Sequence, residues 1–314
     1  MHEDSIPSRV DKVTIKQFSA ETDQEYSDGD SENVLLELFR SPDADTKRQE
    51  LLVSEPEWRL KYHLAYAREN LLNWYEFEPS SVVLEVGSGC GALTGILLRS
   101  CAHVDALDIS PRRSMINAYR NRTAENLTIL VGNLQNYSGK GQYDYVTSIG
   151  VLEYAGRFIK SDEPYLDFLK QLSSQLKKGG KLILAIENRL GIKYWSGSNE
   201  DHTGRLFDSI EDYPENTGIQ TFGRYELDAL LKDAGFKKND FYYPFPDYKM
   251  PVDIYSDRYQ PGVNGVLSSD LFPTSAPDQP RQYLFAENLA MQSIAKNKLF
   301  PYFANSFLVF AEKG

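Results

Sequence analysis

The stretch "VLEVGSGCGALTG", Val83–Gly95, decides the fold. An apolar run that ends in glycines and passes into a second apolar run is typical of a parallel strand, a tight turn and a helix. Glycines at 87, 89 and 91 let the backbone come close to a ligand and point N–H groups at it. The same letters spell G-x-G-x-x-A, the turn of dinucleotide-binding proteins, so the turn alone does not identify the ligand.

Short strand-like runs rich in Val, Ile and Leu alternate with helix-like runs on both sides of this turn. The runs are "SVVLEVG", "ALTGILLRSC", "HVDALDIS", "PRRSMINAYRNRT", "LTILVGN", "YDYVTSIGV", "PYLDFLKQLSSQLKKGG" and "KLILAIEN". This alternation predicts a doubly wound α/β fold with a mostly parallel sheet covered by helices on both faces. Further strands are expected near "DFYYPF" and at the C-terminal "SFLVFAE".

Three regions follow from the composition along the chain. Residues 1–57 are polar and acidic, with one short apolar run, and we expect them to be partly disordered. Residues 58–247 with 305–314 form the core, beginning with one amphipathic helix over Trp58–Phe77. Residues 248–304 are a long insertion before the last strand, which we expect to bind a substrate or a partner.

Composition and charge restrict the class of protein. The formal net charge is −11, and residues 1–57 carry 15 acidic and 6 basic residues, which argues moderately against a nucleic-acid partner. Cys90 and Cys101 have no spacing suited to zinc or to a disulfide framework, and we expect no metal. No long apolar stretch or signal-peptide pattern is present, so we expect a cytoplasmic protein without membrane insertion.

Asp108 ends the next strand, where it can accept hydrogen bonds from the ribose hydroxyls of any adenosine-containing ligand. Three further features favour a cationic ligand over a dinucleotide. Glu85 precedes the glycines, where a carboxylate suits a sulfonium or ammonium group better than a pyrophosphate. Asn133 ends the third strand, where it can reach an adenine edge. The stretch "LKKGGKLILAIEN" predicts a helix, a Gly-Gly turn and a fifth strand. Two other roles remain open: Asp108 could cap the following helix, and Asn133 could stabilise a turn.

With these motifs the chain resembles the class I S-adenosylmethionine-dependent methyltransferases, whose glycine turn E-x-G-x-G-x-G is matched by Glu85–Gly91. The resemblance implies a Rossmann-like, seven-stranded methyltransferase fold with an antiparallel last strand. The implied cofactor is S-adenosyl-L-methionine. The residues expected to bind it are Glu85, Gly87, Ser88, Gly89, Gly91, Asp108, Ile109, Asn133, Leu134, Ile149, Gly150 and, from the preceding helix, His63.

A narrower resemblance rests on "GVLEYA", "IENRLGIKYWSG", "EDHTG" and "FPDYKMP". These segments resemble a bacterial subgroup of methyltransferases that occurs with glycosyltransferases and polysaccharide assembly. The resemblance implies a carbohydrate acceptor and possible glycosyltransferase partners.

His202 is the candidate catalytic base among the four histidines, since methylation of a hydroxyl requires removal of a proton. It lies on a polar loop beside Glu200 and Asp201, and we expect Asp201 to support it. Glu187 and Glu153 are expected to position the acceptor. The alternative is that His202 is an exposed loop residue without a catalytic role. The loop 189–222 and the helix around His63 are a candidate lid.

The leading function is O-methylation of a carbohydrate or other small hydroxyl acceptor. One alternative is a non-catalytic, S-adenosylmethionine-binding accessory protein of a polysaccharide assembly system. A dehydrogenase that uses NAD on a similar fold is disfavoured by Glu85. A DNA amino-methyltransferase is disfavoured because "SIGVLEY" replaces the Asn/Asp-Pro-Pro-aromatic motif.

Overall fold

The computed structural model describes residues 6–19, 29–54, 56–261 and 281–314. The chain divides into two compact units. One comprises Met1–Thr147 with Gln175–Lys177, and the other comprises Ser148–Ser174 with Lys178–Gly314. The predicted boundaries after residues 57 and 247 fall inside these units.

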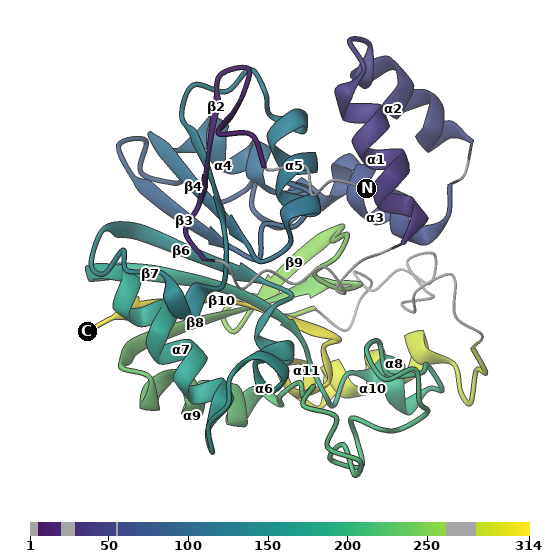
Figure 1. Cartoon of the computed structure of the whole chain (residues 1–314). Helices are drawn as coiled ribbons and strands as arrows, with labels where there is room; N and C mark the ends of the chain where they lie inside the picture. Colours follow the sequence, from purple (N-terminus) through teal and green to yellow (C-terminus); the bar gives the residue numbers. More distant parts are fainter. Residues whose placement is uncertain (1–5, 20–28, 55, 262–280) are drawn as a thin grey trace. The chain divides into compact units, whose positions relative to one another are not determined.

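The first unit carries the glycine turn on a sheet with the strand order β1-β2-β5-β4-β3-β6 (Figure 1). The strands are β1 Arg9–Val10, β2 Val13–Gln17, β3 Val82–Val86, β4 His103–Asp108, β5 Leu127–Val131 and β6 Tyr143–Ile149, the last of which crosses the unit boundary. β3, β4, β5 and β2 pair in parallel, and only β1 is antiparallel to its neighbour. The connecting helices are α4 Thr94–Ser100 and α5 Pro111–Arg120, and the 3-10 turn η2 Leu134–Asn136 follows β5. β5 is buried along its whole length, as expected for a parallel strand that is covered on both faces.

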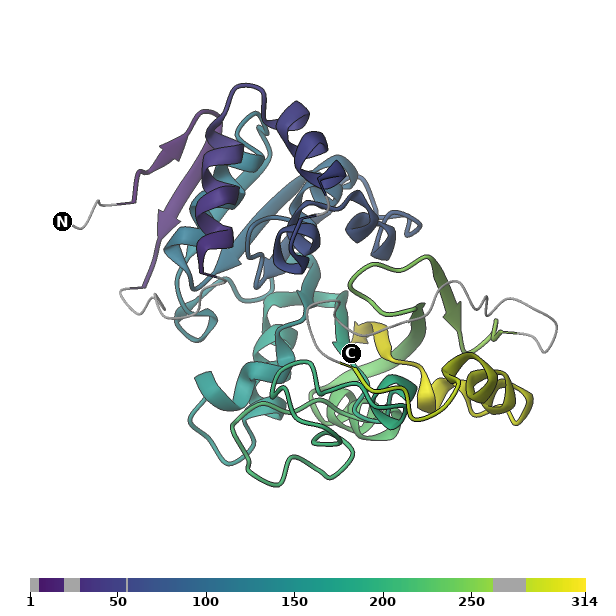
Figure 2. The same cartoon turned by 90° about the vertical axis from the view of Figure 1, so that its right-hand side faces the viewer.

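The acidic N-terminal region contributes regular structure to this unit. Besides β1 and β2 it forms α1 Asp30–Arg40 and α2 Ala44–Val53, and α1 packs against α5 (Figure 2). Apolar residues of α1 join a buried cluster that comprises Leu35, Leu38, Phe39, Leu64, Cys90 and Ile116. On the same helix, Glu32 is fully buried and its Oε1 accepts a hydrogen bond from Nε of Arg113 at 2.8 Å. A buried ion pair of this kind ties the N-terminal region to α5.

The helix expected over Trp58–Phe77 is two separate pieces, so this prediction was wrong. α3 spans Trp58–Leu64, and the 3-10 helix η1 spans Tyr66–Leu71, with an extended Ala65 between them. Two arginines account for the break, since each donates to a carbonyl in the last turn of α3. Arg48 Nε donates to Leu64 O at 2.8 Å, and Arg120 Nη1 donates to His63 O at 2.8 Å. These carbonyls are thereby satisfied without a further helical turn.

The second unit holds the strand order β7-β10-β8-β9. Its strands are β7 Leu176–Glu187, which begins in the first unit, β8 Phe236–Phe245, β9 Asp253–Ser256 and β10 Ser306–Lys313. β10 runs antiparallel to both β7 and β8, as the sequence predicts for the last strand. The helices are η3 Leu152–Tyr154, α6 Ala155–Phe158, α7 Pro164–Gln175, α8 Ile192–Trp195, α9 Arg224–Asp233, α10 Glu287–Lys296 and α11 Phe300–Phe303.

The doubly wound α/β fold with a mostly parallel sheet and an antiparallel last strand, predicted from the sequence, is confirmed, with two differences in detail. Helix α7 ends at Gln175, so the predicted Gly-Gly turn lies within β7 rather than before it. Strands β1, β2 and β9 add to the seven predicted strands. Every helix in the described part of the chain is too short or too polar to cross a membrane.

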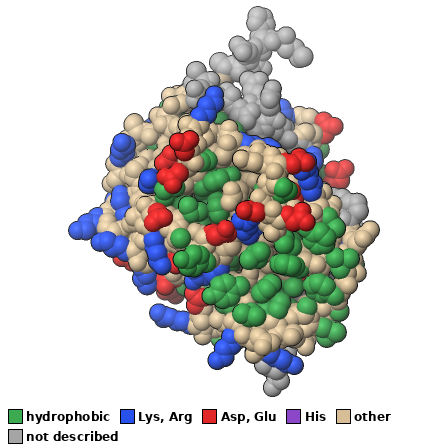
Figure 3. Space-filling model, turned by 90° about the horizontal axis from the view of Figure 1, so that it is seen from below, with side chains coloured by type: hydrophobic (Ala, Val, Ile, Leu, Met, Phe, Trp, Pro, Cys, Tyr) green, Lys and Arg blue, Asp and Glu red, His purple; other side chains and the backbone are tan. Residues whose placement is uncertain are grey.

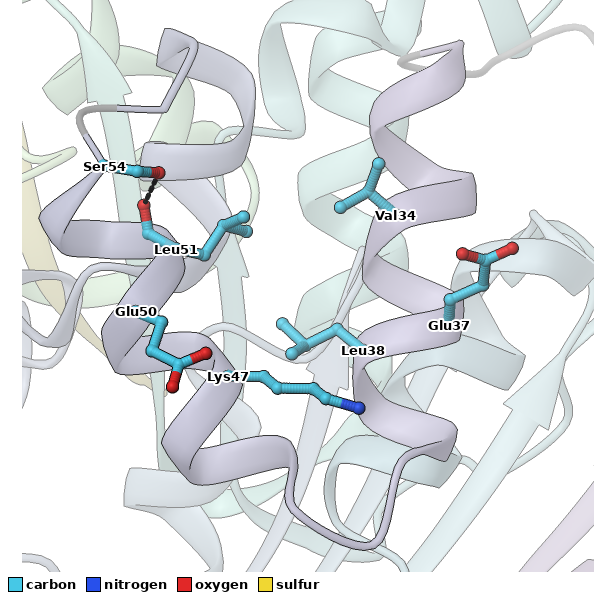
Figure 4. A pocket seen from close by; sticks show the side chains of 7 residues that line it. All are labelled: Val34, Glu37, Leu38, Lys47, Glu50, Leu51 and Ser54. Atoms are coloured by element: carbon cyan, nitrogen blue, oxygen red, sulfur yellow. Dashed lines mark hydrogen bonds between the residues drawn. The ribbon is translucent and has the colours of Figure 1, made fainter.

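Two surface features are formed by residues outside the expected site. A groove of about 440 Å³ between α1 and α2 has an apolar floor and charged edges (Figure 4); it is lined by Val34, Glu37, Leu38, Lys47, Glu50, Leu51 and Ser54. In the second unit, the part of the predicted insertion around α10 exposes Tyr283, Leu284, Phe285, Leu289, Leu299 and Tyr302. Hydrophobic side chains gather on the face drawn in Figure 3.

Candidate active site

The glycine turn at the end of β3 has the backbone that its sequence requires. Gly87, Gly89 and Gly91 have φ angles of 71°, 51° and 75°, in the region that only glycine adopts readily. A Cβ on Gly89 would meet no atom within 4 Å, so the turn is open at this point, whereas one on Gly91 would lie 2.3 Å from Oδ1 of Asn117. The hydroxyl of Ser88 is buried and has no hydrogen-bond partner among the described residues.

Glu85 is a buried carboxylate directly beneath this turn. Its Oε2 accepts a hydrogen bond from Oγ1 of Thr94 at 2.6 Å, and Asn117 Nδ2 donates to the same hydroxyl at 3.0 Å. Burial raises the pKa of Glu85 to about 8, and nearby Asp108 adds to the effect while the Thr94 hydrogen bond opposes it. A cation that binds here would favour the ionised carboxylate.

Asp108 holds the turn from the neighbouring strand. Its Oδ2 accepts the Gly89 N–H at 2.8 Å and its Oδ1 accepts the Ser110 N–H at 2.8 Å. Burial raises the pKa of Asp108, although Arg113 and the two N–H groups oppose the shift. The alternative role as helix cap does not hold, because Ser110 is the N-cap of α5 and accepts the N–H of Arg113 at 3.4 Å. Each carboxylate oxygen keeps a second lone pair for a ribose hydroxyl.

Three other expected cofactor residues lie near the ends of β4 and β5. Asn133 Oδ1 accepts the N–H of Gln135 at 3.0 Å, so the turn-stabilising role weighed for it is present. Leu134 is buried and Ile109 is half-buried. Contact of Asn133 with adenine stays a prediction.

His63 is buried in α3, and its ring lies edge-on to Tyr62 with 5.2 Å between the ring centroids. The His63 carbonyl accepts a hydrogen bond from Nη1 of Arg120, the last residue of α5. Cofactor contact by His63 and closure of its helix as a lid also stay predictions.

The residues of this unit fit S-adenosylmethionine. The turn supplies left-handed glycines, an open position at Gly89 and an unpartnered Ser88 hydroxyl. Glu85 supplies a buried carboxylate without a cation in hydrogen-bonding contact, and Asp108 supplies acceptor oxygens. Glu85 is therefore suited to the cationic methionyl portion and Asp108 to the ribose.

The expected catalytic residues meet in a second cluster, within the second unit. His202 is half-buried as a residue, with a side chain that is 6% exposed. Its Nδ1 lies 2.9 Å from Oε1 of Glu200, and its Nε2 lies 3.6 Å from Oε1 of Glu153 and 3.8 Å from Oε2 of Glu187. The ring also meets Tyr154 edge-on at 5.4 Å. The alternative of an exposed loop histidine is therefore wrong.

Asp201 is not the residue that holds the His202 ring, although the sequence suggested this role for it. Its Oδ2 pairs with Nζ of Lys193 and with Nζ of Lys249, each at 2.7 Å. Lys249 Nζ also donates to Oε1 of Glu187. The partner of the histidine is Glu200, whose Oε2 also accepts the backbone N–H of His202 at 2.7 Å. Asp201 thus holds the two lysines rather than the imidazole.

The charges of this cluster shift one another strongly. Burial alone would lower the pKa of His202, but Glu187, Glu153 and Glu200 raise it well above its ordinary value. Burial raises the pKa of Glu153, and Glu187 adds to this shift while His202 opposes it. Burial would likewise raise the pKa of Asp201, but Lys193 and Lys249 hold it well below the ordinary range. These shifts favour the protonated form of His202, whose ring faces carboxylates.

Glu153, Glu187 and His202 also have the donor types of a metal site, with donor atoms within 4.8 Å of one another. A metal would require neutral His202, whereas the neighbouring carboxylates favour its protonated form. Lys249 also contacts Glu187. The expectation that the chain holds no metal stays a prediction.

Ile149 and Gly150, expected beside the cofactor, lie at the end of β6. Gly150 has φ 70°, and its N–H donates to Ala185 O at 2.9 Å. A Cβ on Gly150 would lie 2.8 Å from the Tyr248 hydroxyl and 3.6 Å from Oε1 of Glu153. In this unit Gly150 therefore borders the His202 cluster, and its contact with the cofactor stays a prediction.

The four sequence segments that carry the narrower resemblance converge on this cluster. "GVLEYA" supplies Glu153, "IENRLGIKYWSG" supplies Glu187 and Lys193, "EDHTG" supplies Glu200 through His202, and "FPDYKMP" supplies Lys249. Lys193 and Lys249 were not singled out in the sequence. Each of these lysines stands among aromatic and aliphatic residues in the sequence, which indicates burial. A buried ammonium group needs a buried carboxylate beside it, and this pattern could have pointed to both lysines.

The methyltransferase domain family matches residues 58–239 of the chain. No curated protein sequence matches it. Among solved structures it is similar to a possible histamine N-methyltransferase from Thermotoga maritima, with 16% identity over 89% of this chain and 100% of that chain and a TM-score of 0.47. It is also similar to phosphoethanolamine N-methyltransferase 2 of Haemonchus contortus in complex with S-adenosyl-L-methionine, with 14% identity over 89% of this chain and 60% of that chain and a TM-score of 0.49.

The family match spans more than half of the chain, and it includes the glycine turn with Glu85 and Asp108. These residues fit the methyl donor, whereas a dehydrogenase would need a turn that accepts a pyrophosphate. The chain therefore belongs to the methyltransferase domain family and is an S-adenosylmethionine-dependent methyltransferase.

Proposed function

We propose that the enzyme methylates a hydroxyl oxygen of a carbohydrate or of another small hydroxyl acceptor. We further propose that Glu153, Glu187, Asp201 and His202 handle this acceptor. The observation that carries the proposal is a pair of buried carboxylate oxygens, Oε2 of Glu153 and Oε2 of Glu187, that have no hydrogen-bond partner among the described residues.

Unpartnered carboxylate oxygens favour a ligand that donates hydrogen bonds. Glu153 and Glu187 are 1% and 0% exposed, and a buried acceptor left unsatisfied costs about 1–3 kcal/mol. Hydroxyl groups of a polyol donate to such oxygens and offset this cost. The Oε1 atom of Glu187 is held by Lys249, whereas its Oε2 lies 3.8 Å from Nε2 of His202, beyond hydrogen-bond distance, and can still accept a hydrogen bond from the ligand.

Transfer to a hydroxyl needs a proton acceptor, and the sequence assigned that role to His202. The surrounding carboxylates raise the pKa of His202 and favour its protonated ring, which is poorly suited to take up a proton. Glu153 has a raised pKa as well, which makes it a stronger base than an ordinary glutamate while it remains ionised. We therefore assign proton uptake to a carboxylate oxygen of Glu153, positioned by the His202 imidazolium.

S-adenosylmethionine supplies an already activated methyl group when it is bound. The protein then has to orient the acceptor, exclude water and take up one proton. Glu85, Asp108 and the glycine turn hold the cofactor in this scheme, and the cluster around His202 supplies the remaining groups.

The carbohydrate class, the polysaccharide context and glycosyltransferase partners rest on the four segments that resemble the bacterial subgroup. Each of these segments supplies a charged side chain to the cluster, which links the resemblance to acceptor chemistry. The same resemblance is compatible with an accessory protein that binds the cofactor without transferring its methyl group, and the experiment below separates the two.

The test combines transfer and binding measurements on the full chain. Methyl transfer is measured with a panel of methyl glycosides, oligosaccharides and matched amino sugars, and S-adenosylhomocysteine affinity is measured by calorimetry. Glu153→Gln and His202→Gln should each lower turnover by roughly 10²–10⁴-fold with cofactor affinity unchanged. Glu211→Gln, an exposed acid of the same loop, is the matched control. Wild-type turnover in both cluster variants would overturn the assignment, and tight cofactor binding without any transfer would favour the accessory protein.

A further inference from the structure

A strand from outside the family match lies beside the cofactor strands in the first unit. β2 pairs in parallel with β5, and the register brings Gln17 opposite Val131 at the carboxyl end of both strands. The Phe18 N–H then donates to Val131 O at 3.1 Å, which extends the pairing by one residue. Ligands of open α/β sheets bind outside the carboxyl ends of the strands. Phe18 therefore lies at the same end of the strands as the expected cofactor residues.

Phe18 packs directly on the turn that follows β5. A Cβ on Gly132 would lie 2.9 Å from Cζ of Phe18 and 2.9 Å from Cβ of Ser19. Gly132 also has φ 150°, so both its conformation and its lack of a side chain admit these two residues. The Phe18 ring meets the Tyr137 ring at 5.4 Å between centroids, and Asn136 Nδ2 donates to the Ser19 hydroxyl at 3.0 Å.

This turn contains Asn133, the residue expected to reach adenine. Oδ1 of Asn133 accepts the Gln135 N–H and keeps one lone pair for the base, so a contact with the face of adenine would have to come from another residue nearby. A half-buried aromatic ring that is already held by Gly132 and Tyr137 is suited to an adenine π-face, because the ring loses little freedom when the base binds.

We propose that Phe18 is an adenine-binding residue of the S-adenosylmethionine site, with Gly132 keeping the space that its ring needs. The methyltransferase domain match begins at residue 58, so this contact is an addition made by the N-terminal region. The proposal concerns the cofactor alone and is independent of the acceptor chemistry proposed above.

The test measures binding rather than turnover. Calorimetry on the full chain gives the affinities of S-adenosylhomocysteine and adenosine for the wild type, Phe18→Ala, Phe18→Leu and Phe18→Tyr. Loss of a base–aromatic contact should lower the affinity for both ligands by roughly 5- to 100-fold in the alanine and leucine variants. Phe18→Tyr should stay near the wild type, as should Lys16→Ala, an exposed change on the same strand.

Thermal melting without ligand separates binding from folding. Phe18→Leu keeps an apolar contact with Gly132 and Tyr137 and should melt like the wild type. Weakened adenosine binding in a leucine variant that melts normally, with binding retained by the tyrosine variant, supports the proposal. Wild-type adenosine affinity in Phe18→Leu, or an equal loss in Phe18→Tyr, overturns it.

Discussion

The Nδ1 atom of His202 lies 2.9 Å from Oε1 of Glu200, and Oε2 of the same glutamate accepts the backbone N–H groups of His202 and Thr203 at 2.7 Å. One carboxylate therefore fixes both the loop and the imidazole ring. The ring is turned so that Nε2 faces Glu153 and Glu187. In the proposed mechanism His202 and Glu153 act as a pair, and Glu200 holds the ring that faces Glu153.

Replacement of Glu200 should change the titration of His202. Glu200→Gln removes one of the three carboxylates that raise the pKa of His202, so this pKa should fall towards its ordinary value and turnover should fall with it. The chain has four histidines, which makes assignment of the His202 ring by NMR practicable. Glu211→Gln is the control, and an unchanged His202 titration in Glu200→Gln would contradict the proposed arrangement.

Lys249 should be a positioning residue of the cluster. Its side chain is 16% exposed and its ammonium group bridges Glu187 and Asp201, so Lys249→Met leaves carboxylate charge buried with less compensation. Breaking a buried pair in this way costs about 3–5 kcal/mol, which urea denaturation would measure as a lower free energy of unfolding. Lys178→Met, an exposed change in the same unit, should have little effect. Equal stability of the two variants would show that Lys249 does not hold the carboxylates.

Cofactor binding should release a proton from Glu85. Since burial raises the pKa of Glu85 to about 8, most of this carboxyl is protonated at neutral pH before binding. A cationic ligand favours the carboxylate, so affinity should rise as the pH increases towards 8 and level off above it. Calorimetry in buffers of different ionisation enthalpy measures the protons released. In Glu85→Gln the pH dependence should flatten, and identical proton release in this variant would rule out Glu85 as the source.

The N-terminal region should contribute to the stability of the first unit. Glu32→Ala breaks the buried ion pair with Arg113, and the expected loss is about 3–5 kcal/mol of unfolding free energy. Glu37→Ala changes an exposed acid on the same helix and should alter stability by less than about 1 kcal/mol. Similar urea midpoints for the two variants would mean that α1 is not tied to α5 through this pair.

The sequence predicts the seven main strands because each contains a stretch rich in Val, Ile, Leu, Phe or Tyr next to turn residues. It misses β1 and β9, which have two and four residues, and β2, whose five residues lie in an acidic region. The break at Ala65 escapes prediction because its cause is tertiary, namely donation by Arg48 and Arg120 to the end of α3. The partners of two neighbouring acids also depend on tertiary contacts that the sequence does not show. Glu200 contacts His202, whereas Asp201 contacts two lysines.

The most direct test of the account is the chemical identity of the transferred methyl group. The enzyme is supplied with S-adenosylmethionine that carries a carbon-13-labelled methyl group, together with the glycoside and amino-sugar panel. Carbon–proton NMR of the product distinguishes a methyl group on oxygen from one on nitrogen. The account predicts an O-methyl signal that is lost in Glu153→Gln. An N-methyl product, or an O-methyl signal that persists at wild-type rate in this variant, would contradict it.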